Sequence, residues 1–390
     1  MIDHEFWDYV NSIQEYQENE IYYPDIFIRY LDSFYYDQRA RPNNPVYATW
    51  DLTNTCNLNC YFCSADAKKG IDKNELDKQS KLKVARRLID WGILYVSIRG
   101  GEPSLCKELI DIVELFVENG VYVEVVSNGT GINKNFCDRL KKLPPSMYRI
   151  KISLDSYIPE VNDCQRGKHS FYFAIKALEN LSEHKIKNIR VQTVITEHNK
   201  GQIFKIYKYL HKYNVHSYGF SLLLPSGRSS NFITPAIEKN ILRQILEIKQ
   251  YEEENKRIKL EKVHFGYLQN IEGNEKFYEA ELDDVSSNKL FKIKCNAAST
   301  RVNINSNGDV YPCDFLKYSP FLAGNLLTND LMDIWESKNF ETIRKVTRFD
   351  KKECNSCKNK KCSTGCMGLS YLRYHSLLRK DPNCNKEVVS

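Results

Sequence analysis

Short apolar runs alternate with longer amphipathic segments from about residue 46 to residue 254, and no other feature of the sequence constrains the fold as much. Apolar side chains recur every three or four residues in the longer segments, which predicts helices, for example at 81–92, 171–184 and 234–254. Strand followed by helix, repeated, predicts a parallel sheet with right-handed crossovers and helices on the outside. The predicted strands, rich in β-branched and aromatic residues, are 46–52, 93–99, 121–126, 148–154, 189–195 and 217–224.

The number of these units predicts an open barrel. Six strand–helix units are fewer than the eight of a closed barrel. We therefore expect an α/β fold: a partial (β/α)6 TIM-like barrel, whose open side admits a large substrate, with a small cysteine-rich C-terminal domain. The predicted divisions are an N-terminal extension at 1–45, the barrel at 46–235, a connector helix and loop at 236–290, and the cysteine-rich domain at 291–390.

The C-terminal region predicts two further elements. The segment "TRVNINSNGDVYPC" at 300–313 predicts a hairpin that turns at Asn307 and Gly308. Residues 328–346 predict one helix that is capped near Thr328.

Composition narrows the class of protein. The chain is 42% hydrophobic and 27% charged, as in ordinary folded proteins. No apolar run approaches the roughly 18 residues of a membrane-spanning helix, and the acidic, aromatic N-terminus does not resemble a signal peptide. We therefore expect a cytoplasmic protein with no membrane contact. The formal charge of +6 is scattered along the chain, so no nucleic-acid partner is expected.

Thirteen cysteines are many for a cytoplasmic chain, where reducing conditions disfavour disulfides and favour metal or catalytic use. Three of them, at 106, 137 and 164, stand alone and are typical of small buried hydrophobes. The other ten fall into patterned groups: Cys56, Cys60, Cys63, Cys295, Cys313, Cys354, Cys357, Cys362, Cys366 and Cys384.

The first group is the C-x3-C-x2-C segment "CNLNCYFC" at 56–63, directly after the first predicted strand. A structural zinc ion takes four protein ligands, and this segment supplies three. An iron–sulfur cube held by three thiolates keeps one iron free to bind a small molecule. The spacing therefore favours a cluster with an open position, and a zinc knuckle is the alternative.

This segment, with the aromatic Phe62 before its last cysteine, resembles the cluster-binding motif of the radical S-adenosylmethionine (SAM) superfamily. The resemblance implies that Cys56, Cys60 and Cys63 hold a [4Fe–4S] cluster whose free iron chelates the amino and carboxylate groups of SAM. It also implies that the reduced cluster cleaves SAM to methionine and a 5'-deoxyadenosyl radical.

Other strand ends resemble the SAM-binding motifs of the same superfamily. "GGEP" at 100–103 implies a contact to the methionine amino group, with Glu102 as acceptor. "SNGT" at 127–130 and "ISLD" at 152–155 imply contacts to the ribose and adenine, and the arginine in "QRG" implies a pair with the methionyl carboxylate. Taken alone, a Gly-Gly at a strand end is more often a turn. The implied SAM contacts are Gly100, Gly101, Glu102, Pro103, Ser127, Asn128, Ser153, Asp155 and Arg166.

The second cysteine group begins with C-x12-G-x4-C around the predicted hairpin and continues as C-x2-C-x4-C-x3-C. One or two structural zinc sites would also fit these spacings. The arrangement resembles the SPASM extension of radical SAM enzymes, which implies two auxiliary clusters and hence three [4Fe–4S] clusters in total. The implied ligands are Cys354, Cys357, Cys362 and Cys384 for the outer cluster and Cys295, Cys313 and Cys366 for the inner one.

No cysteine shortly precedes Cys295, so either an unidentified residue completes the inner cluster or one iron is open to substrate. Asp314, directly after Cys313, resembles an aspartate that is a proposed base in anaerobic sulfatase maturases. A helix or turn cap is the alternative role for this carboxylate.

Together these features predict a radical SAM/SPASM enzyme that abstracts hydrogen from a ribosomally made peptide and then oxidises or cross-links it. We expect a peptide or protein substrate and an electron donor such as flavodoxin or ferredoxin. The alternatives are oxidation of a small molecule such as a tetrapyrrole side chain, formylglycine formation as in sulfatase maturases, and a zinc-stabilised binding protein with a degenerate barrel.

Overall fold

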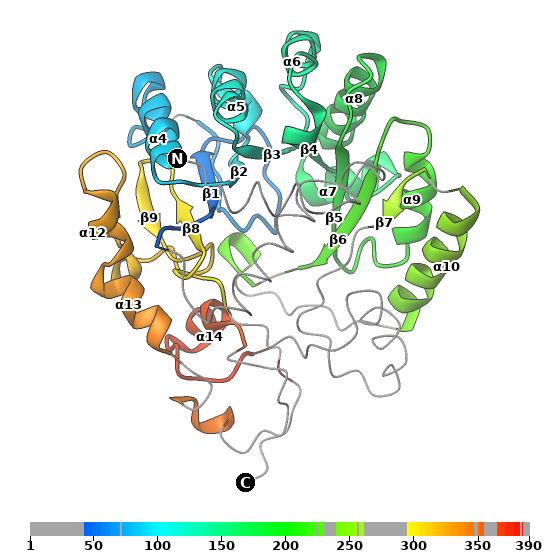
Figure 1. Cartoon of the computed structure of the whole chain (residues 1–390). Coiled ribbons are helices and arrows are strands. Elements are labelled where there is room, and N and C mark those ends of the chain that lie inside the picture. The colour runs from blue at the N-terminus through cyan, green and yellow to red at the C-terminus, as the bar shows by residue number, and fades with distance from the viewer. Residues whose placement is uncertain are drawn as a thin grey trace.

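The computed structural model describes residues 43–70, 72–223, 225–229, 239–255, 257–260, 295–346, 350–354, 365–382 and 384. Nearly all of the predicted N-terminal extension and most of the predicted connector lie outside these residues, so their boundaries stay predictions. Figure 1 shows the described part as a curved sheet with helices along its outer face.

Ten strands of the described residues form one sheet in the order β10-β9-β8-β1-β2-β3-β4-β5-β6-β7. Every pairing from β1 to β7 is parallel, as the strand–helix alternation predicts. The six predicted strands are confirmed within two residues at each end. The strands are β1 (Tyr47–Thr53), β2 (Tyr95–Gly100), β3 (Tyr122–Ser127), β4 (Tyr148–Ser153), β5 (Ile189–Ile195), β6 (Ser217–Leu222) and β7 (Lys259–Leu260).

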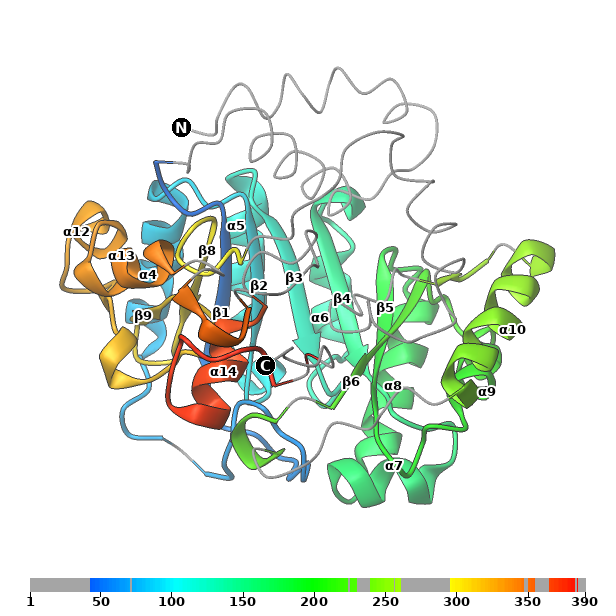
Figure 2. The ribbon, with the colours of Figure 1, turned by 90° about the horizontal axis from the view of Figure 1, so that it is seen from below.

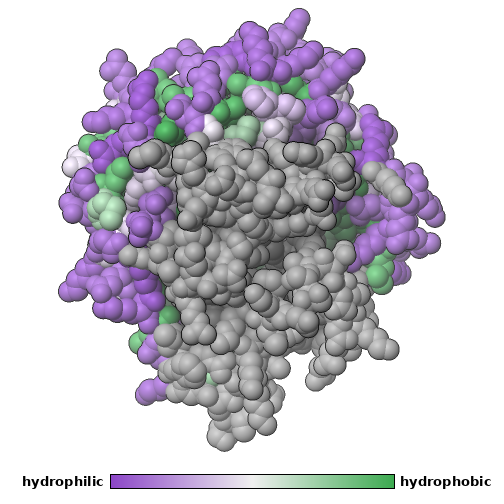
Figure 3. Space-filling view, viewed as in Figure 1, coloured by the Kyte–Doolittle hydropathy of each residue, from purple (hydrophilic) through white to green (hydrophobic). Residues whose placement is uncertain are grey.

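The helices that connect these strands, apart from α7 at the carboxyl end of the strands, cover the convex face of the sheet (Figure 1). α5 is buried along one side because its apolar residues recur at helical spacing, and they pack into the same core as the strands. The connecting helices are α4 (Lys78–Asp90), α5 (Leu109–Glu118), α6 (Lys134–Leu140), α7 (Pro159–Arg166), α8 (Ser170–Glu183), α9 (Ile203–Leu210) and α10 (Lys239–Asn255). Figure 3 shows hydrophilic side chains along the outer rim that these helices form.

Side chains alternate between the two faces of β1. Ala48, Trp50 and Leu52 are fully buried in the core beneath the helices. Thr49 and Asp51 point the other way, toward the concave face, where they meet Arg301 and Lys317. The concave face of the barrel is therefore lined with polar and charged groups, while the convex face forms the apolar core.

The C-terminal region extends the barrel sheet. β8 (Arg301–Ile304) lies parallel to β1, with Arg301 opposite Tyr47. β9 (Asp309–Tyr311) returns antiparallel to β8, and Gly308 adopts a φ of 88° at the turn, which confirms the predicted hairpin. β10 (Gly324–Asn325) then pairs with β9. The cysteine-rich segment is thus tied to the barrel by backbone hydrogen bonds.

The prediction of a single helix over 328–346 is wrong. The structure has two short helices, α12 (Leu331–Trp335) and α13 (Lys338–Lys345), followed later by α14 (Met367–Tyr374). Asp330, and not Thr328, caps α12 by accepting a hydrogen bond from the amide of Met332. Ser337 starts a new helix because its hydroxyl accepts the amide of Phe340. Figure 2 shows α12, α13 and α14 on the side of the sheet that carries β8 and β9.

None of the helices within the described ranges combines the length and apolar character required to cross a bilayer.

Candidate functional site

The loop that carries the first three cysteines leaves the end of β1 and doubles back on itself. The amide of Cys56 donates to the carbonyl of Lys68 (2.9 Å), and the amide of Lys68 donates to the carbonyl of Asn54 (3.0 Å). Cys56, Cys60 and Cys63 are each partly buried, and each thiol is free of a disulfide. The thiols are therefore available as ligands at the carboxyl end of the barrel strands, where the active sites of such barrels lie.

The end of β2 is packed directly against the start of this loop. The amides of Gly101 and Glu102 donate to the carbonyls of Thr53 (2.6 Å) and Thr55 (2.8 Å). A Cβ on Gly101 would overlap the backbone of Thr55, and Gly100 has a φ of 121° and lies against Thr53. The two glycines of "GGEP" are needed for this close approach, which fixes the backbone that leads into Cys56.

Glu102 joins the ends of β2 and β3. Its buried carboxylate accepts hydrogen bonds from the hydroxyl of Ser127 (2.6 Å) and the amide of Asn128 (2.6 Å), besides two from Ser104. Burial raises the pKa of Glu102, and these donors only partly offset that effect. The side-chain amide of Asn128 lies 3.9 Å from the Cys56 sulfur. Three predicted SAM contacts and one predicted cluster ligand are thus brought together.

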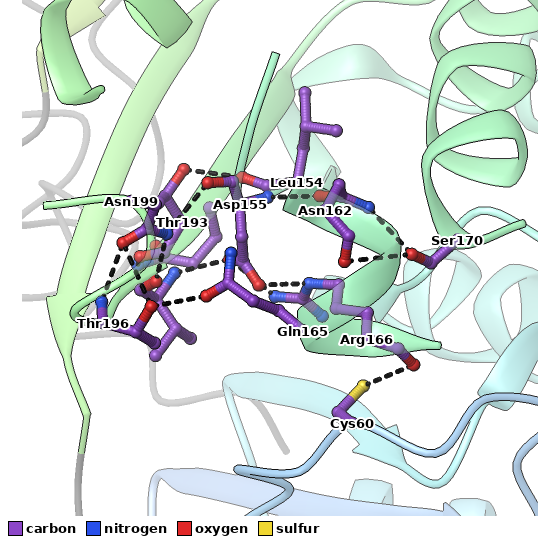
Figure 4. Close-up of polar contacts among 12 residues, drawn as sticks. Cys60, Leu154, Asp155, Asn162, Gln165, Arg166, Ser170, Thr193, Thr196 and Asn199 are labelled. Atoms are coloured by element: carbon purple, nitrogen blue, oxygen red, sulfur yellow. Dashed lines mark hydrogen bonds and ion pairs between the residues drawn. The ribbon is translucent and has the colours of Figure 1, made fainter. Parts of the chain in front are cut away.

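The ends of β4 and α7 support Cys60 (Figure 4). The Arg166 carbonyl oxygen accepts the amide of Asn59 (3.2 Å) and lies 3.5 Å from the Cys60 sulfur. The Arg166 guanidinium is bound by both oxygens of the Asp155 carboxylate, at 2.6 and 3.0 Å. It also lies over the Phe62 ring, 5.3 Å from the centroid. Asp155 and Arg166 are therefore engaged with each other beside the cysteine loop.

A buried polar network behind this ion pair was not predicted from the sequence. The Asn199 side chain donates to the backbone carbonyls of Asp155 and Val194, both at 2.8 Å. The Thr196 hydroxyl donates to Gln165 (2.5 Å), whose backbone carbonyl accepts from the cysteine loop. Figure 4 shows these groups between β5 and α7. The available signal was the polar segment "TEHN" directly after the fifth predicted strand.

Ser153 and Pro103 complete the predicted SAM contacts. Ser153 is the last residue of β4 and is in register with Gln192 of β5. Pro103 is buried at the start of a short 3-10 turn beyond Gly101. Both residues therefore lie at the edge of the barrel where the strands end and the cysteine loop begins.

Three of the C-terminal cysteines lie close enough to influence each other electrostatically. Burial raises the pKa of Cys313, and the neighbouring Cys295, Asp314 and Cys366 raise it further. Cys295 and Cys366 thus lie within electrostatic range of Cys313. Lys351 is fully buried nearby, where burial lowers the pKa of its ammonium group although the adjacent thiols oppose that effect.

Asp381 links Cys366 to Cys384. Its carboxylate accepts the amide of Cys366 (2.7 Å), and its carbonyl accepts the amide of Cys384 (2.9 Å). Cys354 is described as well, at the end of a short 3-10 turn. Cys357 and Cys362 lie outside the described residues, so the predicted outer set is only partly placed.

Asp314 is held between two arginines on the concave face. Its carboxylate pairs with Arg99 of β2 and Arg301 of β8, and it accepts from the Asn303 side chain (2.8 Å). Burial alone would raise the pKa of Asp314, but Arg301 and Arg99 outweigh burial and lower it to about 2. Asp314 therefore ties the segment after Cys313 to the barrel as an ionised carboxylate.

The first cysteine loop supplies three thiols, the number that leaves one iron of a four-iron cube open. Within the described ranges, no three His, Cys, Asp or Glu side chains come close enough to hold one metal ion. The ligands of a zinc ion all lie about 2.3 Å from one point, whereas the thiolates of a four-iron cube each bind a different iron and stand further apart. Thiolates are also the ligands that iron–sulfur clusters take.

Comparison with known proteins decides the family. Residues 50–210 match the radical SAM superfamily, and residues 295–363 match SPASM, an iron-sulfur cluster-binding domain. The mycofactocin maturase of Mycobacterium ulcerans is 30% identical over 344 residues, which cover 87% of this chain and 88% of the relative. This chain belongs to the radical SAM superfamily. It is therefore a radical SAM enzyme, and with its SPASM domain it uses SAM and iron–sulfur clusters.

Other relatives agree with the fold of this radical SAM enzyme. The structure of Streptococcus suis SuiB bound to S-adenosylmethionine matches with a TM-score of 0.72 at 19% identity, over 98% of this chain and 88% of SuiB. SuiB is also known bound to its precursor peptide SuiA. The AdoMet-dependent heme synthase of Methanosarcina barkeri is 24% identical over 353 residues, 88% of this chain and 97% of the relative. The predicted partial barrel is confirmed.

Proposed function

We propose that this radical SAM enzyme matures a ribosomally made peptide. It would cleave SAM to a 5'-deoxyadenosyl radical, abstract a hydrogen atom from the peptide, and oxidise or cross-link the product. The supporting relatives are the mycofactocin maturase, which covers almost the whole chain, and SuiB, which has been seen with a precursor peptide. The observation that carries the chemistry is the set of three free, partly buried thiols at the carboxyl end of the strands.

In this proposal Cys56, Cys60 and Cys63 hold a [4Fe–4S] cluster, which supplies the electron for SAM cleavage when it is bound. Glu102, Ser127 and Asn128 form one hydrogen-bonded group beside Cys56, so they support the assignment of this edge to the methionine and ribose groups of SAM. The carboxylate is the acceptor that an ammonium group needs.

The ion pair between Arg166 and Asp155 refines the predicted role of Arg166. A methionyl carboxylate that bound this guanidinium would share it with Asp155. Ser153, at the end of the same strand, would then face the nucleoside. Gly100, Gly101 and Pro103 would shape the backbone that passes the methionine end.

The auxiliary site would hold two more [4Fe–4S] clusters. Cys295, Cys313 and Cys366 would bind the inner one, and Cys354, Cys357, Cys362 and Cys384 the outer one. The electrostatic proximity of Cys313 to Cys295 and Cys366 supports the inner set. The two clusters would accept the electron released when the substrate radical is oxidised. A small redox protein such as flavodoxin or ferredoxin would supply the first electron. The enzyme would work in the cytoplasm, where thiols stay reduced.

Asp314 is the candidate base for the proton released in that oxidation. Its two arginine partners keep it ionised, as a base must be, but they also make it a weak one. The same contacts would let Asp314 act by holding Cys313 against the barrel. The two roles predict different outcomes for Asp314→Asn.

Oxidation of a tetrapyrrole side chain is the second candidate function. The relative that favours it is the Methanosarcina barkeri heme synthase, of which the match covers 97%. Formylglycine formation is a third possibility within the same chemistry, and it would act on a protein cysteine or serine.

Product analysis separates these functions. The protein is reconstituted anaerobically, reduced with dithionite and incubated with SAM and either synthetic peptides from neighbouring reading frames or iron coproporphyrin III. We expect 5'-deoxyadenosine in all reactions. We expect only one of the peptides to give a product, which should be lighter than that peptide by the abstracted hydrogens. Turnover of the porphyrin with no change in any peptide would replace the first proposal by the second. No 5'-deoxyadenosine under any condition would contradict both.

A further inference from the structure

A short segment after β6 contacts the loop that carries Cys56, Cys60 and Cys63. Neither the motifs nor the comparisons assign this segment a role. It consists of residues 225–229, with a 3-10 turn at Gly227–Ser229. The amide of Arg228 donates to the carbonyl of Cys63 (3.0 Å), and the Arg228 Nε donates to the carbonyl of Cys60 (2.9 Å). A second guanidinium nitrogen donates to the carbonyl of Ala67 (2.5 Å). One arginine thus binds the backbone at two of the three cysteines.

The approach of this segment depends on a glycine. Gly227 has a φ of 59°, and a Cβ at this position would overlap the carbonyl oxygens of Cys63 and Ser64. A side chain here would push the segment away from the loop and separate Arg228 from its three carbonyls. Gly227 and Arg228 therefore act as one unit, with the first allowing the contact that the second makes.

The positive charge of Arg228 is also less neutralised than that of Arg166. Arg166, on the other side of Cys60, is locked to a fully buried carboxylate. Among the described residues, the carboxylate that pairs with Arg228 is that of Asp66 at 3.3 Å, and the Asp66 side chain is 55% exposed, so solvent screens that pair. Arg228 consequently keeps more of its positive charge at the Cys60 backbone, where its Nε binds the carbonyl.

We propose that Arg228 is a positioning residue for the cluster on the first cysteine loop: it fixes the loop backbone through the carbonyls of Cys60, Cys63 and Ala67 and raises the midpoint potential of the cluster. The inference rests on the proposed function, because it requires Cys56, Cys60 and Cys63 to be the ligands. Reduction adds negative charge to the cluster, and a fixed positive charge nearby stabilises the reduced form.

Two substitutions separate the two parts of this role. Arg228→Lys keeps a positive charge but lacks the planar fork that reaches several carbonyls, and Arg228→Gln removes both. We expect both variants to lose the SAM-binding cluster several-fold faster than wild type on exposure to a chelator. Only Arg228→Gln should show a lower midpoint potential. Gly227→Ala should reproduce the faster loss of the cluster without changing a charged residue.

The measurements use the full-length, reconstituted enzyme. The first cluster is identified by the change in its electron paramagnetic resonance signal when SAM is added, and its midpoint potential comes from a titration of that signal. Arg243→Gln is the matched control, because this arginine lies on α10 with a 73% exposed side chain and pairs with Glu247. The control should match wild type in potential and in chelator resistance.

The outcomes distinguish failure of the inference from failure of the proposed function. Equal potentials in wild type and Arg228→Gln, together with equal chelator resistance, would overturn the role of Arg228 while the cluster assignment stood. A SAM-sensitive signal that survives replacement of Cys56, Cys60 and Cys63 by alanine would overturn the proposed ligands, and the inference with them. A lower potential in Arg228→Gln but not in Arg228→Lys supports the effect of the positive charge on the cluster. Faster cluster loss in both variants supports the role of Arg228 in fixing the loop backbone.

Discussion

The Arg166 guanidinium is held by the Asp155 carboxylate through two hydrogen bonds, 2.6 Å from Nε and 3.0 Å from a terminal nitrogen. The Arg166 backbone carbonyl meanwhile contacts the cysteine loop. One residue therefore connects a buried ion pair at the ends of β4 and α7 to the segment that is proposed to carry the cluster. A change at Asp155 should reach Cys60 through Arg166.

Replacing Asp155 by asparagine should destabilise the fold. The Arg166 side chain is only 9% exposed, so the substitution leaves a buried charge without its counter-ion, which costs about 3 to 5 kcal/mol of unfolding free energy. Anaerobic urea denaturation followed by circular dichroism measures this loss. Glu179→Gln is the control, since its pair with Lys176 is exposed and should contribute less than about 0.5 kcal/mol. Equal losses in the two variants would show that the buried pair contributes no more than an exposed one.

Replacing Cys56, Cys60 and Cys63 together by alanine should abolish 5'-deoxyadenosine formation and leave the C-terminal cysteines able to bind iron. The reason is that the proposed SAM-binding cluster has no other thiolates on its loop. The measurement is SAM cleavage by the reduced enzyme, with Cys164→Ser as control because that cysteine is exposed. SAM cleavage by the triple variant at the wild-type rate would refute the ligand assignment.

The reconstituted protein should bind about twelve iron atoms and about twelve sulfides, as three four-iron clusters require. The triple alanine variant should bind about four fewer of each. Elemental analysis for iron and zinc on the same anaerobic samples tests this count. About four iron atoms per chain with zinc in the remaining sites would favour structural zinc at the C-terminal cysteines instead.

Glu124 should make stability fall at low pH. It lies 2.6 Å from Lys151 on the concave face. Burial opposes its ionisation, but Lys151, Arg190 and Arg149 outweigh burial and lower the pKa of Glu124 to about 2. A carboxyl with a depressed pKa stabilises the fold above its unfolded pKa of about 4.3, and this contribution is lost as pH falls from there toward 2.

The expected contribution of Glu124 is on the order of 3 kcal/mol at pH 7. It is the difference in unfolding free energy between wild type and Glu124→Gln. We expect that difference to shrink between about pH 5 and pH 3. A difference that stays constant over this range would mean that the carboxyl has an ordinary pKa.

Asp314→Asn distinguishes a proton acceptor from a tether. If the carboxylate removes a proton from the substrate, the final product should form at least about 100-fold more slowly while 5'-deoxyadenosine still appears. We expect this outcome. Iron content measures the tether, because loosening Cys313 should release iron from the C-terminal clusters. Normal product formation would exclude the base role.

Much of the fold could be predicted from the sequence because its determinants are local. The strand runs and amphipathic helices repeat over a few residues, and the structure keeps all six predicted strands. The division of 328–346 into two helices was not predicted, because Ser337 is compatible with a helix interior and with a cap. Only the fold around it shows which conformation it takes.

The spacing of the cysteines indicated a cluster with one open position, because three thiols lie within eight residues of one loop, and the resemblance of that motif indicated the family. What holds that loop was decided by the tertiary structure alone. Arg166 is 106 residues from Cys60 and Arg228 is 168 residues from it, and both reach it because parallel strands bring their carboxyl ends to one edge. The sequence order predicts that edge, but which side chain crosses to which carbonyl depends on strand register, glycine clearance and burial, and these exist only once the chain is packed.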